Sequence, residues 1–285
     1  MPPSTLGPTS LITERDVSSV RFLLQQMPES EEQTTFIMLT DEEIAGVDGT
    51  QSLELVGSPY LSNEGIDQRS AVASATRSLA ARGMVTLDPE ARDDEGAVLE
   101  GDGDPSKRTM QLSPVLAGVF LLRRSAAGFL TATRVLEDGT TTNSLYFTPD
   151  GTALEEFVTT DGLHLFSLLR RDAIADRLAT YADPFNAASE DGEEQLMNRS
   201  ELTPGFVLPD TRVATTFTAM HPGGGYAAYV YATGDAVHLI DAGAFDEDGP
   251  GDSQTLPMAA VSASTLREML SAILDEVTPP GQPQP

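Results

Sequence analysis

Three Asp-Gly pairs in the middle of the chain constrain its fold more than any other feature of the sequence. They are Asp138-Gly139, Asp150-Gly151 and Asp161-Gly162. Asp-Gly is typical of tight hairpin turns because both residues tolerate a positive φ. Strand-like runs flank the pairs, and the last run is apolar at nearly every position, which is typical of an inner strand. We therefore predict an antiparallel meander with strands at 129–136, 143–147, 153–158 and 163–169.

Helices are expected on both sides of this meander. Thr40-Asp41-Glu42-Glu43 forms a capping box, which predicts the start of a short helix after a strand at 34–39. An apolar stripe predicts a helix over 67–82, and Gly83 would end it in the left-handed conformation. Further helices are expected between Thr13 and Pro28, at 114–123 and at 172–181.

The second part of the chain repeats the order of strands followed by a helix. Strands are expected at 212–220, 226–232 and 236–240, and a helix at 264–277. We therefore predict an α+β fold with a central antiparallel sheet and flanking helices, arranged as two related halves. The predicted boundaries are a disordered N-terminus 1–12, a first half 13–182 containing a mobile acidic loop 88–108, a second half 183–277, and a disordered Pro-rich tail 278–285.

Composition restricts the partners that the chain can bind. Its 17 Lys+Arg against 44 Asp+Glu give a formal charge of -27. Such a charge repels phosphates and anionic lipids, so we expect neither a nucleic-acid nor a membrane partner. The chain has no Cys, which excludes disulfides and thiolate metal sites and fits a reducing cytoplasm. The apolar run 115–122 is much shorter than the roughly 20 residues of a membrane span, and Met1–Ser10 lacks the basic residues of a secretory signal.

Glycine and acidic motifs in the sequence do not complete a ligand site. Gly223-Gly224-Gly225 has the spacing of a dinucleotide-binding loop, but a strand rather than a helix is expected after it. The acidic fragments 100–104 and 246–249 lack the turn glycine or the final glutamate of a calcium loop. We therefore expect no cofactor.

Catalytic and metal-binding side chains are also not grouped in the sequence. His164, His221 and His238 are widely spaced, and His238 and Asp241 should point to opposite faces of one strand, so no shared metal is expected. Glu155 and Glu156 have the appearance of surface residues on a strand. We expect no catalytic residues and no enzyme activity. Paired carboxylates from distant positions stay open as an enzyme alternative.

A second alternative is a winged-helix transcriptional regulator. Residues 39–87 have a suitable size, and the helix at 67–82 would offer Arg69, Arg77 and Arg82 to a DNA groove. The acidic charge of the rest of the chain opposes each phosphate contact. An ordinary amphipathic helix is the simpler interpretation of the same residues.

The order of patterns from Phe36 to Val277 resembles the EspG-type chaperones of actinobacterial type VII (ESX) secretion. The resemblance rests on Leu39-Thr-Asp-Glu-Glu, on Ser58-Pro59-Tyr60-Leu61, and on the helix that ends Leu79-Ala-Ala-Arg-Gly83. The strand Val237-His-Leu-Ile-Asp241, followed by a loop and a Leu-rich helix, is similar to the end of that family. The resemblance implies a quasi-two-fold sheet with helical bundles and a cytoplasmic chaperone, whose partner is a helical secreted protein of the PE/PPE or WXG100 kind.

Such a chaperone needs an apolar patch with a polar rim, because a helix end is recognised by burial of its side chains. The candidate protein-binding residues lie in the Pro-flanked loop 204–209 and on the strands that follow it. The alternative for the strand residues is that they pack within the sheet. The candidates are Phe206, Val207, Leu208, Phe217, Met220, Tyr229 and Tyr231.

Overall fold

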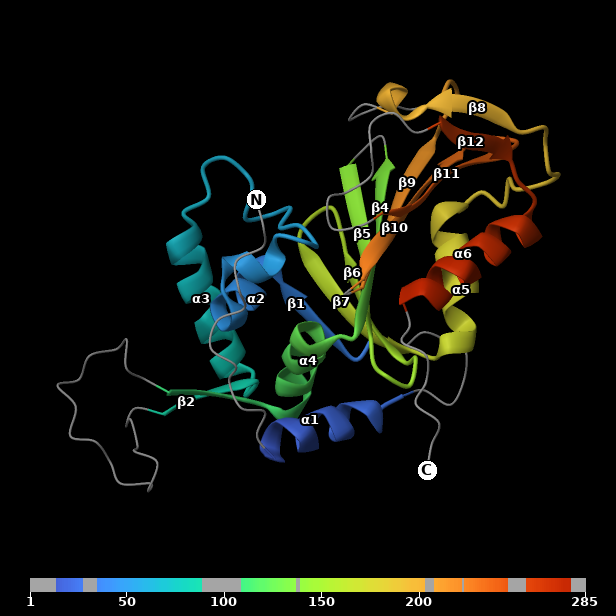
Figure 1. Ribbon diagram of the computed structural model, residues 1–285. Helices are drawn as coiled ribbons and strands as arrows, with labels where there is room; N and C mark the ends of the chain where they lie inside the picture. Colours follow the sequence, from blue (N-terminus) through green and yellow to red (C-terminus); the bar gives the residue numbers. More distant parts are fainter. Residues whose placement is uncertain are drawn as a thin grey trace, which may run out of the picture.

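One ten-stranded antiparallel sheet organises the molecule (Figure 1). The computed structural model describes residues 14–27, 35–88, 109–136, 139–202, 208–221, 223–245 and 255–277. From one edge to the other the strands are β1 (Ile37–Thr40), β7 (Leu163–Leu169), β6 (Ala153–Val158), β5 (Gly139–Phe147), β4 (Gly128–Leu136), β9 (Val213–His221), β10 (Gly224–Ala232), β11 (Val237–Phe245), β12 (Thr255–Ala260) and β8 (Gln195–Asn198). A separate hairpin pairs β2 (Val85–Asp88) with β3 (Thr109–Leu112).

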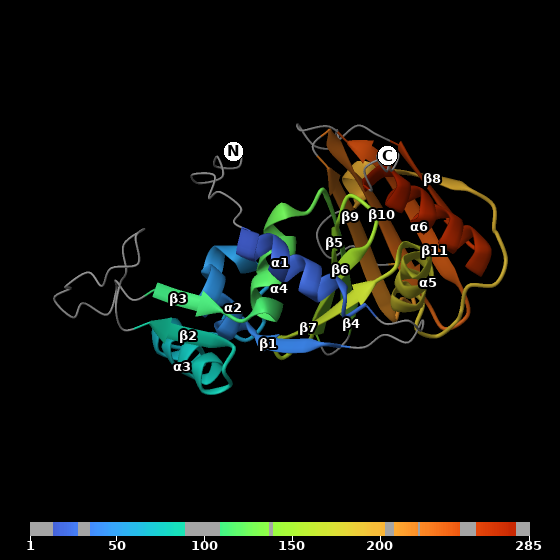
Figure 2. The same cartoon turned by 90° about the horizontal axis from the view of Figure 1, so that it is seen from below.

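Helices of the described residues lie on both sides of this sheet, and the α+β prediction is confirmed. The sheet separates one group of four α-helices from a pair of α-helices (Figure 1, Figure 2). The four are α1 (Glu14–Leu24), α2 (Asp41–Asp48), α3 (Gln68–Ala81) and α4 (Pro114–Ser125); the pair is α5 (Arg171–Ala182) and α6 (Ala263–Val277), and short 3-10 helices are η1 (Thr50–Leu53) and η3 (Arg199–Glu201).

Local sequence determines where the helices of the first half begin and end. The Thr40 hydroxyl accepts a hydrogen bond from the Glu43 backbone N–H, and the Glu43 carboxylate accepts one from the Thr40 N–H, which is the predicted capping box. The Asp67 carboxylate caps α3 by accepting hydrogen bonds from the Ser70 backbone N–H and hydroxyl. Gly83 follows that helix with a φ of 69°, as its left-handed stop requires.

The predicted meander is confirmed as β4, β5, β6 and β7. Gly151 and Gly162 hold the turns with φ of 83° and 81°, and β7 is paired on both sides, as an inner strand should be. Residues 89–108 of the predicted acidic loop, together with 1–12, 246–252 and 278–285, lie outside the described residues.

Two strands of the second half, β8 and β12, are present although the sequence did not predict them, as is the β2–β3 hairpin. Residues 183–194, at the start of the second half, form a loop without helix or strand. The start of this loop is nevertheless anchored, because the buried Asp183 carboxylate accepts hydrogen bonds from the Ala187 and Ala188 N–H groups. None of the described helices is long and apolar enough to cross a membrane.

The two halves of the sheet repeat one arrangement about a quasi-two-fold axis. Each half has an edge strand, an intervening segment, a four-stranded meander and a helix: β1, β4–β7 and α5 in the N-terminal half, and β8, β9–β12 and α6 in the C-terminal half. The halves meet at β4 and β9, where Ala132 lies opposite Phe217. With this pair on the axis, Ala132 and Phe217 are equivalent, and the other equivalent residues are counted from them through the strand pairing. Tyr146 pairs with Phe129, three residues before Ala132, and its equivalent Tyr231 pairs with Ala214, three residues before Phe217.

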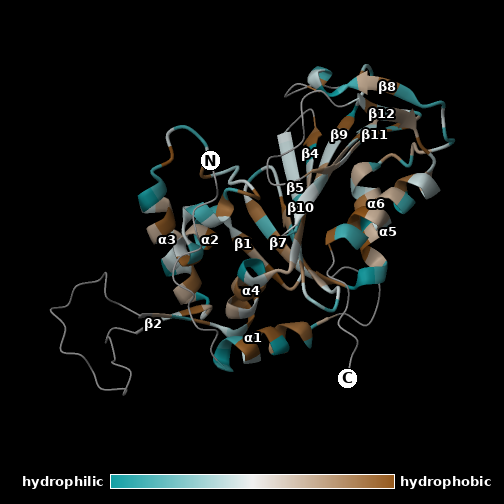
Figure 3. Cartoon of the chain, viewed as in Figure 1, coloured by the Kyte–Doolittle hydropathy of each residue, from teal (hydrophilic) through white to brown (hydrophobic). Residues whose placement is uncertain are grey.

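The helices α5 and α6 obey the same equivalence and pack side by side on one face of the sheet, here called the α5/α6 face (Figure 2). Ile174 and Leu178 of α5 are buried, and so are their equivalents Leu266 and Leu270 of α6. Figure 3 shows both helices banded in hydrophobic and hydrophilic colours, as amphipathic helices are. Their apolar sides and the strands beneath them form the largest hydrophobic cluster.

The two halves differ on the opposite face of the sheet, which does not carry α5 and α6. In the N-terminal half, the segment between the edge strand and the meander contains α2, α3 and α4, and α4 packs on β5 and β6. In the C-terminal half, the equivalent segment between β8 and β9 contains η3 and no α-helix within its described residues. The described helices that pack on β9 and β10 are α5 and α6, from the other face.

Candidate functional site

Buried charges form one cluster under α2 and α4, and its centre is His164 on β7. The His164 Nδ1 lies 2.7 Å from Glu156 Oε1, and its Nε2 lies 2.8 Å from Asp41 Oδ1. All three side chains have 0% exposure. The second carboxylate oxygen of Asp41 accepts hydrogen bonds from the backbone N–H groups of Tyr60 and Leu61. The cluster therefore joins the sheet to α2 and to the turn after η1.

Arg123 of α4 completes this cluster. Its Nε donates to Glu156 Oε2 at 2.9 Å, and its other nitrogens donate to Asp48 and to the Ser52 carbonyl. The Tyr146 hydroxyl also donates to Glu156 Oε2, at 2.6 Å. Each buried carboxylate thus has a cationic or hydroxyl partner, which is the condition for burying charge in a protein interior.

These contacts shift the pKa values of the cluster. Burial by itself would raise the pKa of Glu156, but Arg123 and the hydrogen bond from His164 hold it below the usual value. Burial by itself would lower the pKa of His164, but its hydrogen bonds to Asp41 and Glu156 raise it above the usual 6.5. The pKa of Tyr146 is raised by burial and by the charge of Glu156. The lowered pKa of Glu156 and the raised pKa of His164 both favour an ion pair between these two side chains.

The interpretation of Glu155 and Glu156 as surface residues was wrong, since both have 0% exposure. Neighbouring residues on a strand point to opposite faces, and here both faces are covered. Glu156 joins the cluster described above, whereas Glu155 lies on the α5/α6 face and binds Arg177 at 2.9 Å and Asn143 at 2.8 Å. Because the cluster around His164 is closed to solvent, it fixes α2 and α4 to the sheet and offers no access to a substrate.

The predicted protein-binding residues separate onto the two faces of the C-terminal half. Phe217 is fully buried in the cluster under α5 and α6, so it packs the core and cannot meet a partner. Met220 and Tyr229 belong to the opposite face and are half-buried, and Tyr231 lies beside them with 4% exposure. Phe206 and Val207 lie outside the described residues.

Leu208 is described, and it packs on an apolar cluster of the opposite face, here called the open-face cluster. Half-buried side chains, Tyr229, Met258 and Phe245 among them, surround its fully buried centre. The buried members are Met197, Ala227, Tyr231, Ile240, Ala242 and Leu256.

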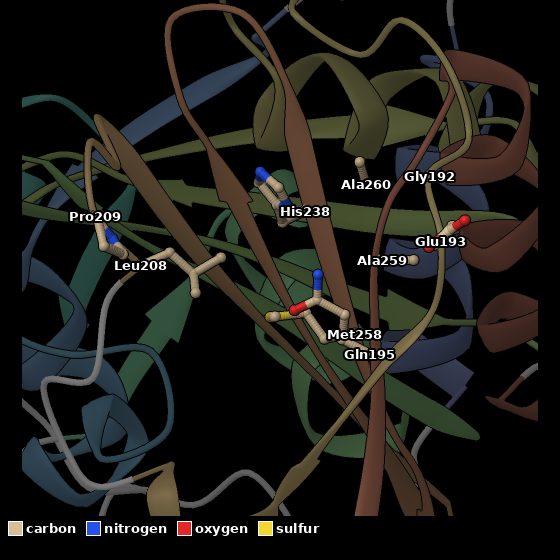
Figure 4. A pocket seen from close by; sticks show the side chains of 9 residues that line it. All are labelled: Gly192, Glu193, Gln195, Leu208, Pro209, His238, Met258, Ala259 and Ala260. Atoms are coloured by element: carbon tan, nitrogen blue, oxygen red, sulfur yellow. The ribbon is translucent and has the colours of Figure 1, made fainter.

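A pocket of about 340 Å³ opens beside this cluster, towards the β8 edge of the sheet. His238 of β11 lies at its centre, with Leu208 and Pro209 on one side and Glu193 and Gln195 on the other (Figure 4). Strand β12 contributes Met258, Ala259 and Ala260, and Gly192 completes the lining. Sequence reasoning named His238 only as a metal candidate and missed the pocket, because its walls come from segments that are distant in sequence.

The arginines of the DNA-binding alternative do not form one free surface. Arg82 donates to Glu43 at 2.6 Å and to the Met38 carbonyl, so it ties α3 to α2 and β1. Arg69 and Arg77 are exposed on α3. The strand β1 pairs with β7 of the large sheet rather than with the β2–β3 hairpin, whereas a winged-helix unit pairs its first strand with its wing.

The glycine and histidine motifs named in the sequence lie on strands of the sheet. Gly224 and Gly225 lie at the start of β10, so no helix N-terminus faces a phosphate there. Asp241 accepts a hydrogen bond from the Tyr226 hydroxyl on the α5/α6 face, whereas His238 lines the pocket on the opposite face, as predicted. Within the described ranges, no group of three His, Asp or Glu side chains could hold a metal ion.

Comparison with known proteins adds no family to these observations. No family model matches the chain, and no curated protein matches its sequence.

Proposed function

We propose that this chain is a non-enzymatic, cytoplasmic chaperone that binds the apolar end of a helical secretion substrate, as the EspG-type resemblance implies. The observation that carries the proposal is the open-face cluster of the C-terminal half. It lies where the N-terminal half is covered by α2 and α4, and no α-helix of the described residues belongs to it.

Half-buried aromatic and thioether side chains support a protein partner for this face. Tyr229, Met220 and Met258 are chemically suited to recognition, because Tyr offers a rigid apolar ring with a polar tip and Met adapts its shape to the partner. Such side chains beside a pocket, with polar residues at its rim, form the usual arrangement of a surface that accepts a helix.

Charge also favours a protein partner over a nucleic acid. The Lys and Arg residues of 183–277 are Arg199, Arg212 and Arg267, among many more Asp and Glu. Arg267 pairs with Asp176 at 2.5 Å, and the Arg212 guanidinium lies over the Phe185 ring. A phosphate backbone would approach this half against a strongly negative field.

Co-purification tests the proposal. The tagged full chain is purified from its native host while the secretion genes are expressed, and bound proteins are identified by mass spectrometry. We expect a small, secreted, helical protein in a fixed ratio to the chain. A Tyr229→Lys variant should lose that partner, because it places a charge on the open face, whereas Glu268→Lys on the exposed side of α6 should retain it.

Two results would contradict the proposal. The chain could elute without a secreted partner although the candidate substrates are expressed. Alternatively, both variants could retain the partner equally, which would place the binding surface elsewhere and remove the structural support for the proposed role.

A further inference from the structure

The internal equivalence identifies the kind of element that the pocket lacks. In the N-terminal half, residues equivalent to the pocket floor are Leu154, Phe166 and Leu168, with exposures of 0%, 0% and 3%. They belong to one cluster with Leu116 and Phe120 of α4. The helix α4 also packs on β6, the strand of Leu154, so an amphipathic helix covers this part of the face in the first half.

The register shows that the pocket occupies the same position in the second half. Phe166 pairs with Ile37 of the edge strand β1, and Met258 pairs with Gln195 of the edge strand β8. Leu154 pairs with Leu168, and His238 pairs with Ala260. The residues His238, Met258 and Ala260 remain partly exposed, although their equivalents are buried. The floor of the pocket is thus the helix-binding position of the repeat, and no α-helix from the described residues of its own half covers it.

Charge at the rim defines the helix that would fit. Glu193 lines the pocket, and Glu194 and Asp210 are exposed beside its lining residues. On α4 itself, the apolar residues Leu116, Val119 and Phe120 are followed after one turn by Arg123 and Arg124. A helix with the same apolar spacing and with basic residues beside it would satisfy both the floor and the rim.

We propose that the pocket receives an apolar side chain from an amphipathic, basic-flanked helix of the partner protein, which docks in the place that α4 occupies in the N-terminal half. This proposal rests on the proposed function, since it specifies how the substrate helix is held. The helix carries apolar residues at positions i, i+3 and i+4, and Lys or Arg near Glu193.

Fluorescence anisotropy with a defined probe tests the proposal on the full chain. The probe is a labelled, hydrocarbon-stapled peptide that presents the Leu116, Val119 and Phe120 face of α4 and carries lysines on its other face. A control peptide has alanine at the three apolar positions. We expect the probe to bind and the control peptide to bind at least about tenfold more weakly.

Two variants test whether the probe binds in the pocket. Ala260→Met fills the cavity and should weaken probe binding about tenfold. Glu193→Lys reverses an exposed charge without disturbing the core, and should weaken binding about two- to fivefold and reduce its dependence on salt. Glu268→Lys, on the exposed side of α6, is the matched control and should bind as the wild type does.

The outcomes separate this proposal from the proposed function. No probe binding, or equal binding by the wild type, Ala260→Met and Glu193→Lys, overturns the pocket as a helix site, even where a secreted partner co-purifies with the chain. Pocket-dependent probe binding without any secreted partner supports the helix site and contradicts the chaperone role. Thermal unfolding of Ala260→Met is measured alongside, and Glu193→Lys tests the site independently of core packing.

Discussion

The two halves of the sheet share their register but bury different chemistry on the face opposite α5 and α6. In the N-terminal half, Glu156 and His164 occupy the centre of this face and bind groups on α2 and α4. Their equivalents in the C-terminal half are Ile240 and Leu256, both with 0% exposure. One half thus holds its covering helices through ion pairs, whereas the other has an apolar cluster whose half-buried outer side chains form its surface.

The same difference recurs on the α5/α6 face. Arg177 of α5 pairs with Glu155, which also accepts a hydrogen bond from Asn143. The equivalent positions hold Met269, Leu239 and Ala228, which all belong to the hydrophobic cluster under α6. Buried polar groups therefore mark the N-terminal half on both faces of the sheet.

Buried ion pairs and apolar contacts differ in how strictly they orient a partner, and this difference determines which role each suits. A buried ion pair accepts its partner in few geometries, because a displaced charge loses its hydrogen bonds at high cost. It suits a permanent contact such as that between α4 and the sheet. An apolar surface tolerates many orientations and loses less on separation, so it suits a partner that binds and is released. Four sets of substitutions test this difference between the halves.

The largest effect is expected from Arg123→Met. This change removes the buried guanidinium shared by Glu156 and Asp48 and leaves them only His164 and the exposed Arg124, so the free energy of unfolding should fall by about 3 kcal/mol. Urea unfolding followed by circular dichroism measures it. Arg267→Met, which breaks the exposed pair with Asp176, is the control and should cost at most about 1 kcal/mol. Equal losses in the two variants would show that the buried cluster contributes no more to stability than an exposed ion pair does.

The next largest effect concerns pH and His164. Folding raises the pKa of His164 above its usual 6.5. The stability that His164 contributes is therefore complete below pH 6.5 and is lost as pH rises through the higher pKa of the folded state. The pKa of Glu156 is lowered, so its contribution is complete above 4.5 and is lost as pH falls through the lower pKa of the folded state.

The cluster should therefore stabilise the fold most between about pH 4.5 and 6.5. Comparison of the wild type with His164→Gln by urea unfolding at several pH values measures this contribution. The difference between the two proteins should shrink as pH rises above 6.5. A difference that grows with rising pH would contradict a protonated His164 between the two carboxylates.

A smaller effect is expected when Arg177, Glu155 and Asn143 on the α5/α6 face are replaced by the equivalent residues of the other half. Arg177→Met alone should lower the free energy of unfolding by about 1–2 kcal/mol, because it leaves Glu155 buried with a weaker set of partners. Adding Glu155→Leu and Asn143→Ala removes the buried charge and should return stability to within about 1 kcal/mol of the wild type. A triple variant less stable than Arg177→Met would mean that the two halves are not interchangeable on this face.

Sequence predicted the elements whose signals are local. The Asp-Gly turns, the Thr40 capping box and the Asp67–Gly83 limits of α3 depend on residues within a few positions of one another. The strands β8 and β12 escaped prediction, because β8 is only four residues long and Pro257 within β12 argues against a strand inside a sheet.

The candidate site was harder to predict than the fold. Tyr229, Met220 and Leu208 were named and lie on the face opposite α5 and α6, whereas Phe217, named with them, packs within the sheet under α5 and α6, which was the alternative for the strand residues. Both faces of β9 mix apolar residues with threonine, so its alternation does not tell which side a helix covers. The pocket and the His164 cluster combine residues separated by up to 123 positions, so their existence depends on the register of the whole sheet.

The smallest expected effect compares the last residues of the two edge strands, Thr40 of β1 and Asn198 of β8. Thr40 caps α2 through its hydroxyl, whereas its equivalent Asn198 makes no side-chain capping bond to η3. Thr40→Ala should therefore lower the free energy of unfolding by about 1 kcal/mol, and Asn198→Ala by less than about 0.5 kcal/mol. Urea unfolding of both variants measures the difference. Equal losses would mean that the end of β8 is fixed as firmly as the end of β1, although it leads into no α-helix of the described residues.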